Sequence, residues 1–344
     1  MRNHSIDILK FVFAIIVVIG HGDIPNAPKY LVPIRFALFC FFMISGYLIE
    51  KPDITKTNDS IKKSILHLVK TFIYCFFIFF PTYLFIVYYF KQEPLFNGWS
   101  IINICVFNET PFWMHFWYLS AYFYLLIFML FFNKLPRRNT LIYAIPFLLI
   151  FALLLGPYSE LILDKKFEII TYRNAWFMGL PSFCLGAIIK RTQIYKYISS
   201  NILFSALFIS ALLPYFESRA LHSYYEEFYF SNILFAFFLL LVVLKHPLTH
   251  PNILSNLGVN YSMELYIIHP LFIFFIRKFV WLNYGESGIL SYLYFETPVV
   301  ILVSLCVLKL WHMIKAQYFE KQTTVAQEQK CHNKSKDYDK TVTK

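Results

Sequence analysis

Apolar stretches of about 20 residues recur along almost the whole chain, and a helix of that length spans a bilayer. The 344 residues are 58% hydrophobic and 15% charged, whereas a soluble domain carries about 25% charged residues. We therefore predict an all-α integral membrane protein, and not a soluble fold with an anchor. Ten transmembrane helices can be drawn, at roughly 5–22, 33–49, 65–90, 112–132, 140–156, 174–190, 199–216, 230–245, 261–282 and 290–314.

These segments form one predicted polytopic membrane domain over residues 1–316. Residues 317–344 are polar, rich in lysine and almost free of large apolar side chains. A segment that cannot bury apolar surface stays disordered. We expect a disordered basic cytoplasmic tail behind the membrane domain.

Lysine and arginine are concentrated in alternate loops, at 51–63, 134–138 and 190–196, and again in the tail. Loops rich in these residues stay on the cytoplasmic side of a membrane protein. The bias places both termini in the cytoplasm, which requires an even number of spans. The same bias explains the formal net charge of +11 as charge on cytoplasmic loops. No nucleic acid is therefore expected as a partner.

The six cysteines include no Cys-x-x-Cys pair. Most lie in apolar segments, where free cysteine behaves as a small buried hydrophobe, so neither a disulfide framework nor a zinc site is expected. No His, Asp and Glu cluster has metal-ligand spacing, and no glycine-rich phosphate loop or dinucleotide fingerprint occurs. The sequence predicts no metal and no bound cofactor.

The first apolar segment carries ionisable side chains. Asp7 and Lys10 precede an apolar run that His21 closes. Lys10 and His21 are eleven residues apart, which is about three helical turns plus 20°, so they share one helix face about 16 Å apart along the axis. Ionisable groups inside a membrane usually face a bundle interior or a water-filled cavity and mark function. This stripe is the first candidate site.

Short motifs follow one another along the rest of the chain. They are IDILK at residues 6–10 followed by His21, RFALFCFFMISGYL at 35–48, HFWYLSA at 115–121, YRN at 172–174, FMGLPSFCLG at 177–186 and YSMELYIIHP at 261–270. In this order and spacing the series resembles the membrane acyltransferase-3 family, whose members are polytopic O-acyltransferases. Many of them acetylate sugars of bacterial surface polysaccharides.

The resemblance implies about ten spans in a bacterial cytoplasmic (inner) membrane and an acyl-CoA, such as acetyl-CoA, as co-substrate. It also implies that His21 is the general base that takes the proton of a sugar hydroxyl. Lys10 stands where the family often has arginine. The positive charge is therefore kept, but the two parallel hydrogen bonds that a guanidinium can donate are not available. As a hypothesis, Lys10 stabilises negative charge on the acyl-CoA donor or on the developing oxyanion.

Both residues also have a structural interpretation. His21 can cap the first span at the interface, and Lys10 can form an ion pair with Asp7 at i, i+3. For His269, directly before Pro270, a structural role at a helix start is expected. The pair Ser45 and Gly46 most simply allows a close approach between two helices.

The remaining candidates are assigned to the acceptor. Arg35 and Arg173, with Asn174, can bind acceptor hydroxyls or an anionic sugar or phosphate, helped by a helix N-terminus; the alternative for the arginines is snorkelling to the interface. A second set, His115, Trp117 and Tyr118, can hold a sugar by stacking and hydrogen bonds, or can belong to an interfacial aromatic belt.

The sequence thus predicts a membrane O-acyltransferase, and an O-acetyltransferase in the first place. It would move an acyl group from cytoplasmic acyl-CoA to a hydroxyl of a surface polysaccharide or lipid-linked sugar, with membrane lipid as its surroundings. The alternative is an exporter or flippase of a glycan or lipid-linked sugar, because the same polar stripe could line a permeation path.

Overall fold

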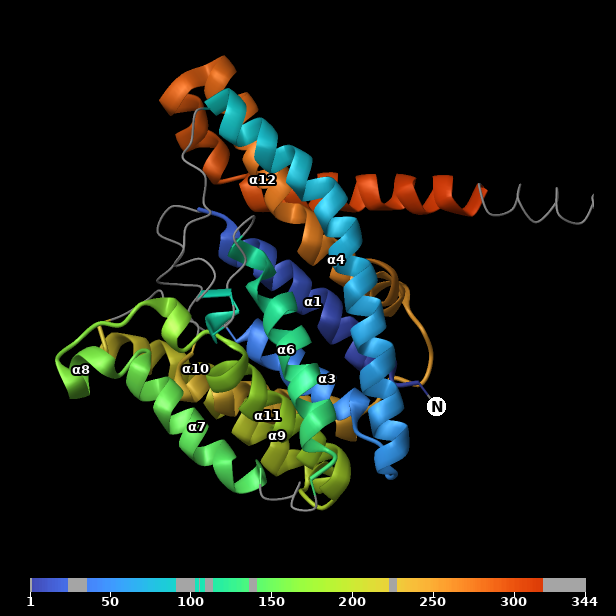
Figure 1. Cartoon of the computed structure of the whole chain (residues 1–344). Coiled ribbons are helices and arrows are strands. Elements are labelled where there is room, and N and C mark those ends of the chain that lie inside the picture. Colours follow the sequence, from blue (N-terminus) through green and yellow to red (C-terminus); the bar gives the residue numbers. More distant parts are fainter. Residues whose placement is uncertain are drawn as a thin grey trace, which may run out of the picture.

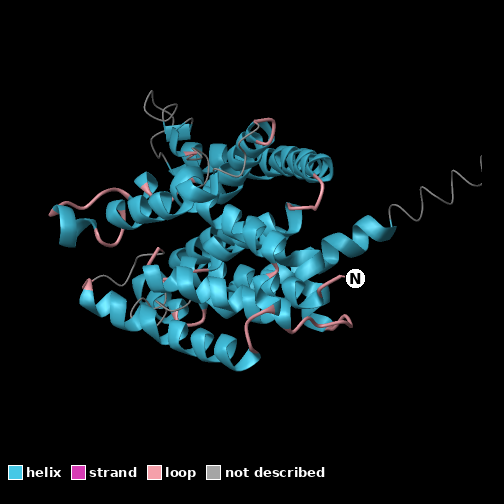
Figure 2. Ribbon diagram, turned by 90° about the horizontal axis from the view of Figure 1, so that it is seen from below, coloured by secondary structure: helices cyan, strands magenta, loops and turns pink. Residues whose placement is uncertain are grey.

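The computed structural model describes residues 2–23, 36–90, 103–104, 106–108, 114–135, 141–222 and 228–317. Within these ranges every regular element is a helix and no strand occurs (Figure 2). The all-α class predicted from the apolar pattern is therefore confirmed. The predicted tail, except for its first residue, lies outside the described residues.

Each of the ten predicted segments overlaps a helix. The helices are α1 (His4–His21), α3 (Ala37–Ile49), α4 (Ile54–Phe90), α6 (Trp117–Phe132), α7 (Leu141–Leu155), α9 (Leu180–Thr192), α10 (Ser200–Ala220), α11 (Phe230–Lys245), α12 (Ile253–Leu293) and a last helix, Glu296–Gln317. Shorter elements are η2 (Met114–Phe116), α8 (Ser159–Leu163), η4 (Ile169–Thr171), the π-helix η5 (Ala175–Gly179) and η6 (Ile194–Lys196).

Five of these helices are long and apolar enough to cross a membrane. They are α1, residues Ile54–Tyr88 of α4, α10, α12 and the last helix. Their outer faces expose large apolar side chains, such as Phe77, Phe208 and Phe279, which are 71%, 67% and 62% exposed. Such surfaces fit lipid and not water. The chain is a membrane protein; the count of ten crossings and the cytoplasmic position of both termini stay predictions.

Several predicted boundaries were wrong because polar residues extend the helices beyond their apolar parts. Helix α4 begins at Ile54, where Asp53 Oδ1 accepts a hydrogen bond of 3.0 Å from Thr55 N–H. Helix α12 begins at Ile253, where Asn252 and Ser255 form a capping box. It is kinked at Gly285, whose φ of 63° suits glycine. It then continues to Leu293, and the last helix starts at Glu296 and not near residue 290.

The helices form two groups joined by α1 and α3. In Figure 1, helices α7, α9, α10 and α11 lie on one side, with α4, α12 and the last helix on the other. Helix α1 packs against α12, α3 against α9, and α1 also contacts α3. The contact between α1 and α12 is close, because a Cβ on Gly258 would lie 1.8 Å from the Asp7 carbonyl oxygen. Helix α1 is thus held inside the bundle.

The close approach expected at Gly46 is confirmed. A Cβ on Gly46 would lie 1.9 Å from the Phe183 carbonyl oxygen, and one on Gly186 would lie 1.8 Å from that of Met43. Two glycines, one on each helix, therefore let the backbones of α3 and α9 touch.

Replacing Gly46 with valine is expected to separate α3 from α9. The added carbons meet backbone, which cannot rotate away, so the cost should reach or exceed the usual overpacking penalty of about 1–3 kcal/mol. The measurement is the temperature at which the detergent-purified protein loses its monodisperse size-exclusion peak. Gly20→Ala is the matched control, because no atom lies within 4 Å of its added Cβ, and it should leave that temperature unchanged or slightly raised.

Candidate active site

His21 is the last residue of α1. The helix ends there because Gly22 takes an extended conformation while its N–H donates to the Val18 and Ile19 carbonyls, at 3.1 and 3.2 Å. Gly22 has little room for a side chain, since a Cβ would lie 2.7 Å from Thr297 Oγ1. The C-terminus of α1 is therefore seated against the start of the last helix, and the exposed His21 is held at this junction.

Three histidines from different elements meet at the end of α1. The ring centroids of His21 and His269 are 5.2 Å apart, and those of His115 and His269 are 5.8 Å apart. His115 comes from η2 and His269 from the middle of α12, and both are buried, at 5% and 0% exposure. The two buried imidazoles thus form a layer behind His21.

Backbone carbonyls fix the buried rings. His269 Nδ1 lies 3.1 Å from the Leu265 carbonyl oxygen, and His115 Nε2 lies 3.2 Å from that of Ile267. A carbonyl oxygen only accepts, so each of these nitrogens carries the proton and donates. The Tyr266 hydroxyl donates in turn to the His115 carbonyl. Helix α12 continues through Pro270, so the helix start expected at His269 was wrong.

A cavity of about 590 Å³ opens beside His21. Its walls combine apolar side chains with two cations and an indole, and it is lined by His21, Pro270, Ile273, Phe274, Arg277, Lys278, Trp281 and Ile289. The Lys278 ammonium lies over the Trp281 ring, 4.4 Å from its centroid. A largely apolar concave site with a few polar groups is typical of small-molecule binding.

An ion pair between a half-buried arginine and a buried glutamate ties this cavity to the end of α1. The Arg277 guanidinium bonds both carboxylate oxygens of Glu296, with Nη2 to Oε2 at 2.6 Å, and its Nη1 lies 2.7 Å from Asp23 Oδ2. Glu296 also accepts from the Asp23 N–H at 3.2 Å, and its side chain is fully buried. The bidentate pair therefore joins α12, the last helix and the residues that follow His21.

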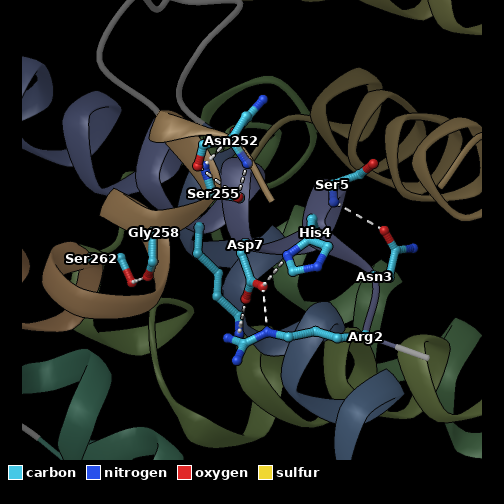
Figure 3. Close-up of polar contacts among 10 residues, drawn as sticks. Arg2, Asn3, His4, Ser5, Asp7, Asn252, Ser255, Gly258 and Ser262 are labelled. Carbon is cyan, nitrogen blue, oxygen red and sulfur yellow. Dashed lines mark hydrogen bonds and ion pairs between the residues drawn. The ribbon is translucent and has the colours of Figure 1, made fainter. Parts of the chain in front are cut away.

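A charge cluster surrounds Asp7 at the other end of α1, where Arg2 and His4 lie beside its carboxylate (Figure 3). Lys10 belongs to this cluster. Its Nζ is 3.6 Å from Asp7 Oδ1, while Arg2 Nε donates to Oδ2 at 2.8 Å and His4 Nδ1 lies 4.0 Å from it. The hydrogen bond to Asp7 raises the pKa of the Arg2 guanidinium above its ordinary value. The Asp7 ion pair considered for Lys10 is present, and the Lys10 side chain is 28% exposed.

Lys10 and His21 do not meet at one reacting atom. Helix α1 is continuous from His4 to His21, so eleven residues separate the two by about 16 Å along the axis. Of the two roles considered for Lys10, contact with the donor's negative charge fits this spacing better than contact with an oxyanion beside His21.

The aromatic candidates lie inside the protein. Trp117 and Tyr118 are 7% and 8% exposed, and His115 belongs to the histidine layer described above. The Tyr118 ring packs against Phe42, with centroids 4.6 Å apart. The Arg173 guanidinium lies over the Trp117 ring at 5.0 Å, a cation–π contact. These side chains therefore belong to the protein core beside the histidines, and the interpretation as a lipid-facing belt fits them less well.

Asn174 acts as a helix cap. Its Oδ1 accepts from Trp176 and Phe177 N–H at 3.0 and 3.1 Å, and its Nδ2 donates to the Ile170 and Thr171 carbonyls at 3.0 and 2.9 Å. These four bonds use the full capacity of the amide, so Asn174 organises the start of η5. Arg35, the other acceptor candidate, lies outside the described residues.

Sequence reasoning missed the cavity residues on α12 and the pairing of Arg277 with Glu296. The available signal was an ionisable residue in an apolar segment, which Arg277 and His269 both satisfy. Among the described residues, no group of three His, Cys, Asp or Glu side chains is arranged to hold a metal ion.

The chain was also compared with known proteins. A family model described as an acyltransferase domain, that of the acyltransferase-3 family, matches residues 3–311, which is most of the chain and includes both ends of α1 and the cavity. Comparisons with curated proteins and with solved structures found no match. The coverage of the family model shows that this membrane protein belongs to the acyltransferase-3 family.

Proposed function

We propose that the protein is a membrane O-acyltransferase of the bacterial cytoplasmic membrane. It moves an acyl group, acetyl in the first place, from cytoplasmic acyl-CoA to a hydroxyl of a surface polysaccharide or lipid-linked sugar. The observation that carries the proposal is His21 on the wall of a cavity of about 590 Å³, in front of two buried imidazoles, in a chain of an acyltransferase family.

The chemistry requires a base, because a sugar hydroxyl is a weak nucleophile near neutral pH. His21 accepts the hydroxyl proton while the oxygen attacks the thioester carbonyl carbon. The carbon–sulfur bond then breaks, the acyl group stays on the sugar oxygen, and the proton on His21 passes to the CoA thiolate. Free CoA and a sugar ester are the products, and no redox partner is needed.

In this proposal the two ends of α1 have different roles in binding and catalysis. Lys10, at the N-terminal end, contacts an anionic part of the donor, and His21 acts at the cavity. The acceptor enters the cavity against α12, where Trp281 offers a ring for stacking on a sugar. Arg173, over Trp117, stays a candidate acceptor contact, while Asn174, His115 and Tyr118 shape the surrounding structure.

Replacing Lys10 with methionine is expected to raise the KM for acyl-CoA about tenfold or more, because a charged hydrogen bond contributes about 1.5–3 kcal/mol. The kcat should change less, and Lys10→Arg should keep most of the affinity. Lys62→Met is the matched control, since Lys62 pairs with Asp59 at the same i, i+3 spacing but is 62% exposed on α4. Equal effects of both substitutions on KM would contradict the donor role.

The test of the proposed function is product analysis with purified protein in vesicles. Acyl-CoA and a native glycan fraction are supplied, free CoA is followed by thiol titration, and alkali-labile esters on the glycan are identified by mass spectrometry. Stoichiometric CoA release and glycan ester support acyl transfer. Movement of glycan across the vesicle membrane without any CoA release, with acetyl and longer donors, would overturn it in favour of export.

A further inference from the structure

Among the described residues, the Nε2 atom of the buried His269 ring lacks the hydrogen-bond partner that a buried nitrogen normally has. This nitrogen is buried, and the whole residue is 0% exposed. Its Nδ1 donates to the Leu265 carbonyl, so in the neutral ring Nε2 holds a lone pair and can only accept. A buried acceptor without a donor is costly and is rare in folded proteins.

Two imidazoles lie near enough to be the donor. His115, 5.8 Å away between centroids, uses its Nε2–H on the Ile267 carbonyl, and a neutral ring has no second N–H. His21, whose ring centroid is 5.2 Å away with the planes tilted by 40°, remains. At this separation a side-chain rotation brings one nitrogen of each ring to an ordinary hydrogen-bond length of about 2.9 Å.

We propose that His269 is a positioning residue for His21. It accepts the N–H of His21 at Nε2 and so selects the tautomer in which the other His21 nitrogen is basic and turned to the cavity. The inference rests on the proposed role of His21 as the base. Orientation of a catalytic histidine by a third group is the arrangement found in nucleophile–base triads; here the orienting group is a neutral imidazole fixed by the carbonyl of Leu265.

Three variants test the proposal. His269→Phe keeps an aromatic ring and removes both nitrogens, and it should lower kcat about 10²-fold, the lower range of a general-base contribution, with less than a threefold change in the KM for acyl-CoA. His269→Gln places an amide group near the Nε2 position and should recover at least tenfold in kcat over His269→Phe. The double variant His21→Ala with His269→Phe should be no slower than His21→Ala alone, because His269 acts through His21.

A structural role makes different predictions. His269→Phe would then lower the melting temperature and affect kcat and KM together, His269→Gln would not rescue, and the double variant would lose activity additively; any of these results overturns the proposal. His250→Phe, at an exposed loop position, controls for the substitution itself. If wild-type protein releases no CoA, the proposed function fails; if His21 is required but His269→Phe keeps full kcat, only the positioning role fails.

Discussion

Replacing His21 with alanine lowers the rate of acyl transfer about 10²–10⁴-fold, the range that a positioned general base contributes. The protein still folds, because His21 is exposed at the end of α1 and fills no core space. The rate is measured as CoA released from acyl-CoA in the presence of glycan, at saturating concentrations of both. The KM for acyl-CoA stays within a few fold, since Lys10 and its neighbours lie at the other end of the helix.

His21→Gln separates basicity from size and polarity in this experiment. Glutamine can hydrogen-bond the acceptor but cannot take its proton, so it should be as slow as alanine. The matched control is His250→Ala, which removes an exposed imidazole from a loop and should keep the wild-type rate. A His21→Gln variant with near wild-type kcat would show that His21 binds the acceptor and that another group is the base.

Replacing Arg277 with methionine destabilises the protein by about 3–5 kcal/mol, the usual effect of leaving a buried charge without its partner. The fully buried Glu296 carboxylate would lose both guanidinium hydrogen bonds and keep the Asp23 N–H as a donor. The junction that holds Gly22 and His21 would loosen with it. The measurement is unfolding by SDS in mixed micelles, compared with wild type.

A double variant shows whether the penalty comes from the stranded carboxylate. Arg277→Met with Glu296→Leu removes both charges and should recover most of the lost stability, because a buried ion pair contributes little net free energy. Lys278→Met is the neighbouring control and should cost only about 0.5–1 kcal/mol, the value of an exposed cation–π contact. A double variant as unstable as Arg277→Met would instead assign the loss to packing.

The helices were predictable from the sequence, and their partners were not. Apolar runs set the position of each span, because lipid requires them. The starts at Ile54 and Ile253 depend on polar caps beyond those runs, which hydropathy does not register. Packing between helices in a membrane depends on small residues and close contacts and not on hydrophobicity, so Gly46 could be identified while its contact with Phe183 could not.

In the candidate site too, individual residues were predictable from the sequence and their contacts were not. Lys10 and His21 stand out because each is ionisable in or beside an apolar run and they share a helix face. His269 carries the same signal, but its relation to His21 exists only once α1 packs against α12. The Arg277–Glu296 pair joins two helices, α12 and the last helix, and exists only in the folded arrangement of the two. Asn174 shows the opposite case. The sequence assigned its side chain to acceptor binding, but its amide makes all four of its hydrogen bonds with backbone groups of neighbouring residues.

The central claim is transfer of an acyl group from acyl-CoA to a glycan hydroxyl with His21 as the base. The most direct measurement is the incorporation of radiolabel from acetyl-CoA into the glycan fraction of membranes that contain wild-type protein, His21→Ala or no protein. The account predicts label with wild type, at a level at least 10²-fold above that with His21→Ala once background is subtracted. Label that is equal in all three membranes, with acetyl and longer acyl donors, would contradict it.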